Sequence, residues 1–212
     1  MNEYSLREEK LNIISHAIGF LLSIIALVLL LMRATAFGNV WHIVSVSIFG
    51  LSLIVLYAAS TLYHSAKQQE LRNRLKIVDH SAIYFLIAGT YTPFTLITLN
   101  STKGWLIFGI SWGMALIGII LKLFFTGKYK SISTLLYVLM GWMIVFAIKP
   151  LMDSLPLDGL YWLLAGGVAY TIGAVLYSIK KIKFNHAIFH VLVLIGSFCH
   201  FYSVLVYVLP SK

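Results

Sequence analysis

The sequence predicts an all-α, polytopic membrane protein that folds as a seven-transmembrane-helix bundle. Apolar residues make up 60% of the 212 residues and charged residues only 11%, whereas soluble domains contain about 45–50% and about 25%. The mean hydropathy is +0.91. The apolar residues also gather in seven blocks, each close to the roughly 20 residues that cross a bilayer as a helix. A soluble enzyme and a disordered chain are therefore poor fits.

Short links join the seven blocks, so we expect a single transmembrane domain over residues 1–212. Each block is apolar all round, which suits a helix whose outer face meets hydrocarbon while its backbone bonds internally. The charged segment 1–11 precedes a block that is too long for the apolar part of a signal peptide, so we expect the first span to be retained. The predicted spans are 12–32, 40–64, 77–99, 104–125, 132–149, 159–179 and 186–209.

Lys and Arg are unevenly distributed between the links. Twelve of the sixteen lie before the first span and in the second, fourth and sixth links, whereas the opposite side holds Arg33, Lys103, Lys149 and Lys212. The positive-inside rule then predicts a multi-pass cell-membrane protein with a cytoplasmic N-terminus and an outer C-terminus. The net charge of +9 indicates topology and contact with anionic membrane lipids. It does not indicate a nucleic-acid partner, because the basic residues form no single patch.

Histidines and one carboxylate gather near the predicted cytoplasmic ends of three spans, and ionisable residues in a bilayer are candidates for function. His186 and His190 are four residues apart, which puts both imidazoles on one helix face, about 6 Å apart along the axis. This spacing suits two ligands of one divalent metal ion; two interhelical hydrogen bonds are the alternative. His64 closes the second span and is the natural third ligand. Asp79 is the only carboxylate within a predicted span.

Three histidines and a water molecule form an open metal site of the catalytic type. One zinc ion is the default, although iron, nickel or cobalt also suit histidine ligands. Asp79 would hold or deprotonate the water on the metal. Ser60, one turn before His64, would bond Asp79, the water or an imidazole, and a hydrogen bond to its own helix backbone is the alternative. We therefore predict a metal site in which Asp79 and Ser60 are catalytic and the ligands are His64, His186 and His190.

Other marked residues have less specific expectations. His80 is next to Asp79 in the sequence and therefore points to a different face of the helix. It is expected beside the site or at a helix interface. His16 is expected to line the cytoplasmic mouth or to be hydrogen-bonded at an interface. Pro93 should kink the third helix. Gly109 and Gly113 form a GxxxG pair, which is typical of close helix packing.

Four stretches carry a combined pattern: EKLNIISH (9–16), STLYH (60–64), DHS with AGTYTP (79–81 and 88–93), and HAIFH (186–190) followed by His200. In this order they resemble the haemolysin III family, the bacterial branch of the progestin and adipoQ receptor superfamily. The resemblance covers almost the whole chain. It implies a seven-helix bundle that holds zinc on the cytoplasmic side through His64, His186 and His190, with Asp79 contacting the metal through water.

The resemblance also implies an activity. Eukaryotic receptors of the superfamily resemble ceramidases, and the superfamily is regarded as a group of metal-dependent membrane hydrolases. We therefore expect a zinc-dependent hydrolase of an amide or ester bond in a membrane lipid. The haemolysin name implies an alternative, a cytolytic or pore-forming membrane protein. A receptor or sensor in which zinc is structural is the third candidate, and hormone recognition is not carried over.

Overall fold

The computed structural model describes residues 5–126, 128 and 130–211, and every secondary-structure element in this range is a helix. Seven helical segments are long and apolar enough to cross a membrane, which confirms the predicted fold class. Lys212, assigned above to the outer side, lies outside the described residues. The elements are α1 (Leu6–Phe37), α2 (Val40–Ser65), α3 (Gln69–Pro93), η1 (Phe94–Leu99), α4 (Thr102–Phe125), α5 (Lys130–Gly141), η2 (Met143–Ala147), α6 (Ile148–Ser154), α7 (Leu157–Ser178), α8 (Asn185–Ser203) and η3 (Val204–Val208).

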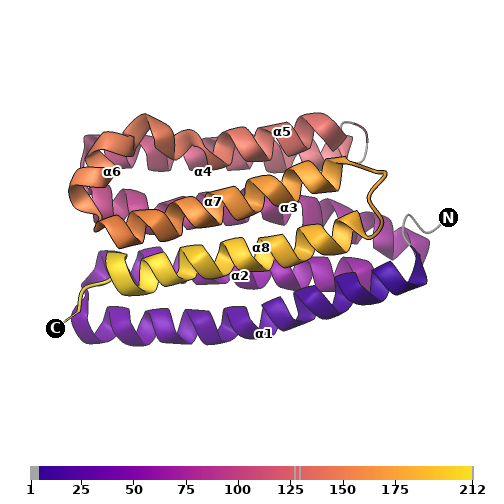
Figure 1. Cartoon of the computed structure of the whole chain (residues 1–212), viewed down its shortest axis with the longest axis horizontal. Coiled ribbons are helices and arrows are strands. Elements are labelled where there is room, and N and C mark those ends of the chain that lie inside the picture. The colour runs from indigo at the N-terminus through magenta and orange to yellow at the C-terminus, as the bar shows by residue number, and fades with distance from the viewer. Residues whose placement is uncertain (1–4, 127, 129, 212) are drawn as a thin grey trace.

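The helices lie side by side along the long axis of the molecule (Figure 1). α1 packs against α2 and α8, α2 packs against α3, and α7 packs against α8. α5 contacts both α3 and α7, which joins the two halves of the chain. The chain enters the bundle with α1 at one end and leaves it with η3 at the other (Figure 1). We call the end where α1 begins the N-terminal end; α2 ends there, and α3 and α8 begin there.

α1 begins at Leu6, six residues before the first predicted span. The side chain of Ser5 caps the helix by accepting a hydrogen bond from the backbone N–H of Glu8 at 3.2 Å. The carboxylates of Glu8 and Glu9 then lie in the first turn, where the positive end of the helix dipole favours them. Both side chains are buried. The expectation that Asp79 is the only carboxylate within a span is therefore wrong.

The third span changes its helix type at Pro93. The α3 helix ends there, and the π-helix η1 follows directly. Proline has no N–H to bond the carbonyl four residues earlier, and a π-helix, with its longer hydrogen-bonded turn, is one way to continue past that gap. The Thr95 hydroxyl donates to the Tyr91 carbonyl at 2.9 Å. The local irregularity that the sequence predicts at Pro93 is thus a wider helical turn.

Gly89 and the pair Gly109 and Gly113 have opposite surroundings. A Cβ atom at Gly89 in α3 would overlap the Cβ and Oγ atoms of Ser52 in α2, so these helices approach closely because residue 89 has no side chain. A Cβ atom at Gly109 or Gly113 in α4 would meet no atom within 4 Å among the described residues. The prediction that this GxxxG pair packs closely against another helix is therefore wrong within the described chain.

Candidate metal centre

Three histidine side chains meet at the N-terminal end of the bundle. His64 lies in the last turn of α2, and His186 and His190 lie in the first two turns of α8. One ring nitrogen of each lies within 4.8 Å of the other two, and all three side chains are buried. The structure thus brings together the three residues predicted as ligands, and the cluster could hold a metal ion.

The spacing within this cluster suits a tetrahedral ion. The Nε2 atoms of His64 and His186 are 3.2 Å apart. Two nitrogen ligands at about 2.0–2.1 Å from a tetrahedral zinc ion lie about 3.3 Å from each other. The ring centre of His190 is 4.5 Å from that of His186 and 5.1 Å from that of His64. The first two imidazoles therefore need almost no rearrangement to share an ion. The two interhelical hydrogen bonds that were the alternative for His186 and His190 are also present, to His64 Nε2 and to the Asn12 carbonyl.

Hydrogen bonds indicate which nitrogen of two of the rings is available. Nδ1 of His64 lies 2.7 Å from a carboxylate oxygen of Glu9, and Nδ1 of His190 lies 3.3 Å from the backbone carbonyl of Asn12. An ionised carboxylate and a carbonyl can only accept, so each Nδ1 carries the hydrogen. Nε2 is then the nitrogen with a lone pair. Histidines that bind metals commonly have this arrangement, with the far nitrogen donating to an oxygen.

Arg72, in the first turns of α3, supports the same region. It is buried and forms an ion pair with Glu9, and its guanidinium lies 4.7 Å from the ring centre of Tyr63. Its Nη1 group also donates, at 3.4–3.5 Å, to three backbone carbonyls at the end of α2, those of Tyr63, His64 and Ala66. In the sequence, Arg72 is one of the basic residues of the second link that indicate topology, although its position two helical turns before Asp79 could have indicated that it faces the site.

Asp79 and Ser60, predicted as catalytic, lie beside the histidine cluster. Both are buried, and both line the same cavity as His186 and His190. Among the described residues, the ligand atoms close enough to share an ion come from the three histidines alone. The Ser60 hydroxyl has no hydrogen-bond partner of ordinary geometry in the described part of the chain. The backbone hydrogen bond that was the alternative for Ser60 is therefore not found there.

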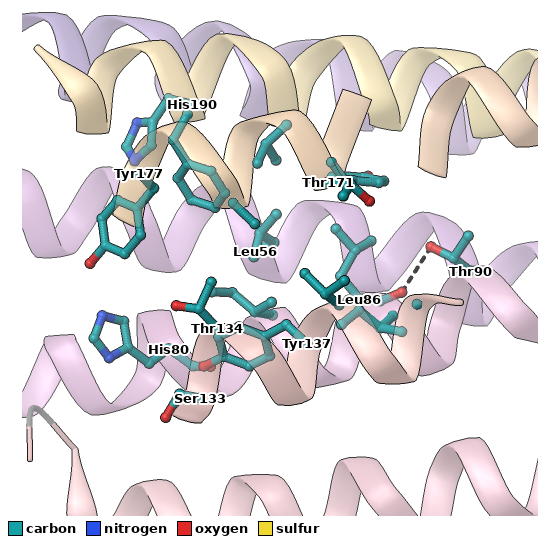
Figure 2. Close-up of a pocket in the computed structure, with 18 of the residues that line it drawn as sticks. Leu56, His80, Leu86, Thr90, Ser133, Thr134, Tyr137, Thr171, Tyr177 and His190 are labelled. Carbon is teal, nitrogen blue, oxygen red and sulfur yellow. Dashed lines mark hydrogen bonds between the residues drawn. The ribbon is translucent and has the colours of Figure 1, made fainter. Parts of the chain in front are cut away.

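His16 is more central than the sequence indicates. Its ring stacks on that of His190, with ring centres 3.5 Å apart and planes 8° apart. It is 3% exposed, and neither of its ring nitrogens makes a hydrogen bond of ordinary geometry among the described residues. His80 lines the cavity as well. Figure 2 shows His80 and His190 on different helices at the same end of that cavity.

The cavity runs from the histidine cluster along the inside of the bundle. It has a volume of about 160 Å³, and most of its lining is apolar or aromatic. Figure 2 shows Thr171 and Thr90 toward the end opposite Tyr177 and His190. His186 and His200 both line it, and their separation along α8 corresponds to roughly 21 Å. The cavity therefore covers much of the hydrocarbon thickness of a bilayer, about 30 Å.

The fold and the site together define a class: integral membrane proteins of seven helices with a buried cluster of three histidines at one end. A protein-family model described as "Haemolysin-III related" matches residues 4–201. The chain belongs to the haemolysin III family.

Similarity to individual proteins agrees with this assignment. The chain is 47% identical to Hemolysin-3 of Bacillus cereus over 205 residues, which are 97% of this chain and 94% of the relative. It is 48% identical to the Hemolysin-3 homolog of Bacillus subtilis (strain 168) over 204 residues, 96% of each chain. A more distant relative is the human Monocyte to macrophage differentiation factor, 32% identical over 181 residues, 81% of this chain and 73% of that protein. The family resemblance predicted from the motifs is confirmed.

Proposed function

We propose that this protein is a zinc-dependent hydrolase that cleaves an amide or ester bond of a membrane lipid. The observation that carries the proposal is the 3.2 Å separation of Nε2 of His64 from Nε2 of His186, in a buried cluster beside an apolar cavity. Nitrogen donors suit zinc. When bound by three imidazoles, zinc keeps one position open, lowers the pKa of a water there to about 7 and polarises a carbonyl.

Asp79 and Ser60 have the positions that proton transfer requires. Asp79 is a buried carboxylate beside the cluster, so it can accept the proton of an attacking water and return it to the leaving group, as a general base and then a general acid. The Ser60 hydroxyl can donate to the Asp79 carboxylate or to the carbonyl oxygen of a substrate. This role fits the buried position of Ser60, whose hydroxyl already lies within hydrogen-bonding reach of the Asp79 carboxyl.

The shape and lining of the cavity favour a lipid as the substrate. Its lining includes the polar side chains of His16, Ser60 and Asp79 and apolar walls that include Leu56, Leu86 and Val193. A lipid would place its apolar chain between these walls and its amide or ester group at the polar end. Such a chain would also exclude bulk water from the reacting bond.

We further propose that the protein lies in the cell membrane with the N-terminal end of the bundle facing the cytoplasm, because the basic residues concentrate at that end. Cys199 is the only cysteine and is buried, so a Cys199→Ser background permits single-cysteine labelling. In intact cells, a membrane-impermeant thiol reagent should label Ser101→Cys and leave Lys181→Cys unmodified. Labelling of Lys181→Cys alone would show that the protein has the opposite orientation.

The metal proposal is tested by measuring metal per chain in detergent-purified protein. The wild type should hold one zinc ion, His186→Ala should lose it, and Asp79→Asn should keep most of it. His42→Ala is the matched control, because His42 is a half-buried residue that bonds Asn39 at the start of α2, at the other end of the bundle. Wild-type protein without stoichiometric metal, or unchanged metal content in His186→Ala, would refute the proposed site.

Catalysis is tested separately by incubating the protein with lipid extracts and identifying products by mass spectrometry. The wild type should release a fatty acid together with the corresponding amine or alcohol, and Asp79→Asn should do so about 10²–10⁴-fold more slowly. Metal binding without any product would favour the receptor or sensor alternative.

Cytolysis is the second candidate function, and the name of the Bacillus cereus relative, Hemolysin-3, favours it. Leakage from phosphatidylcholine vesicles separates the two candidates. A pore should survive Asp79→Asn and His64→Ala, whereas lysis caused by lipid hydrolysis should disappear in both variants.

A further inference from the structure

The first turns of α1 contact all three clustered histidines, although α1 contributes none of them. The contacts are Glu9 to His64 Nδ1 at 2.7 Å, Asn12 carbonyl to His190 Nδ1 at 3.3 Å, and Glu8 carboxylate to the backbone N–H of His186 at 3.4 Å. All three α1 residues are buried. α1 therefore helps to hold the cluster in place.

His64 needs such support because of its place in the helix. It is the next-to-last residue of α2, where backbone carbonyls lack partners within the helix and the last turn frays. Arg72 donates to these carbonyls and also pairs with Glu9, while Glu9 accepts from the His64 ring. One arginine–carboxylate pair thus holds both the backbone and the side chain of His64.

We infer that Glu9 and Arg72 form a positioning pair that fixes the ring orientation and the Nδ1–H tautomer of His64, and thereby sets the metal affinity of the three-histidine cluster. The inference rests on the proposed function only in that the cluster binds a metal ion. A carboxylate that accepts from the far nitrogen of an imidazole orients the ring and makes the other nitrogen a stronger ligand. Arg72 compensates the charge of a carboxylate that would otherwise be buried without a partner, which is costly.

The test measures the affinity of the purified full-length protein for Co²⁺, a probe whose visible absorption reports ligand geometry, by competition with a chelator. Glu9→Ala should bind about 10–100-fold more weakly than the wild type. Glu9→Gln keeps an acceptor oxygen without the charge and should fall between the two. Arg72→Lys keeps the charge but loses the fork that contacts Glu9 and the α2 carbonyls together, so its affinity should also fall.

The chain contains a matched control pair on α3. Glu70 and Arg74 form an ion pair 2.6 Å long with side chains 80% and 76% exposed, away from the histidine cluster. Glu70→Gln should bind Co²⁺ as the wild type does. The melting temperature of each metal-free variant is measured in parallel. A positioning role predicts an altered Co²⁺ spectrum at saturation, which a loss of stability alone would not produce. If Glu9→Ala fails to fold, Glu9→Gln decides.

Affinity within twofold of the wild type in Glu9→Ala, or weaker binding with an unchanged saturated spectrum, would overturn the positioning role. Two failures are distinguishable. If the wild type and His186→Ala both bind no metal, the proposed function and this inference fail together. If His186→Ala loses the metal while both Glu9 variants retain full affinity, only this inference fails.

Discussion

Replacing Gly89 by alanine should destabilise the protein by forcing α2 and α3 apart. A Cβ atom at residue 89 would overlap both Cβ and Oγ of Ser52. Ser52 is fully buried, and its hydroxyl donates to the Phe49 carbonyl at 2.6 Å, so the side chain cannot turn away without losing that bond. The overlap is with a short side chain fixed to its own helix, and the two helices must therefore separate.

The magnitude follows from two opposing effects. Alanine is favoured over glycine in a helix by about 0.8–1.0 kcal/mol, whereas adding a methyl group to a packed interior costs about 1–3 kcal/mol. Gly109→Ala in α4 gains the first effect without the second, because its Cβ atom would meet no described atom within 4 Å. The free energies of unfolding of the two variants should therefore differ by about 1–3 kcal/mol, the steric cost alone.

The assay is unfolding by sodium dodecyl sulfate titration in mixed micelles, monitored by circular dichroism. Adding Ser52→Gly to Gly89→Ala removes both overlapped atoms and should recover most of the loss, so the two changes are coupled. Equal stability of Gly89→Ala and Gly109→Ala would refute the close contact. A double variant no more stable than Gly89→Ala would show that the cost arises elsewhere.

Two further predictions concern stability. Removing the metal with a chelator should lower the melting temperature of the wild type, because free metal at 100 times its dissociation constant stabilises the fold by about 2.7 kcal/mol. The melting temperature of His186→Ala should not change. Equal shifts in both proteins would contradict a metal held by the cluster. Tyr91→Phe should cost about 1–3 kcal/mol, because the buried hydroxyl accepts from the Ile144 N–H at 2.9 Å and donates to the Gly141 carbonyl at 2.8 Å. Tyr161→Phe is the control for Tyr91→Phe, because Tyr161 is 58% exposed. Its free energy of unfolding in the sodium dodecyl sulfate titration should change little. Similar losses in both variants would contradict the role of the buried hydroxyl.

Hydropathy predicts the seven spans because a bilayer makes the same demand on every helix. It predicts helix ends less well. The first apolar block starts at residue 12, but capping by Ser5 and the helix dipole extend α1 back to Leu6. Glu9 therefore lies inside the bundle, although its charge and its place before the apolar block indicate a solvated segment.

The histidine cluster is predictable because its members have a regular spacing and a shared depth. The partners of these histidines are less so. Arg72 looks like one more basic residue of a link, and only its pairing with Glu9 in space shows that it is buried. Gly109 and Gly113 show the same limit of sequence-based prediction. Their spacing predicts that they share a helix face, but it does not predict which neighbouring helix that face contacts.

The contact between Glu8 and His186 joins positions 178 residues apart, which has a consequence for biosynthesis. At about 5–20 residues per second, roughly 9–36 s separate the synthesis of these two residues. During that interval the acidic first turn of α1 waits for the last helix. Arg72 follows Glu9 by only 63 residues, so this carboxylate gains a cationic partner early. A nascent chain released before α8 is complete would keep that ion pair and could not load metal.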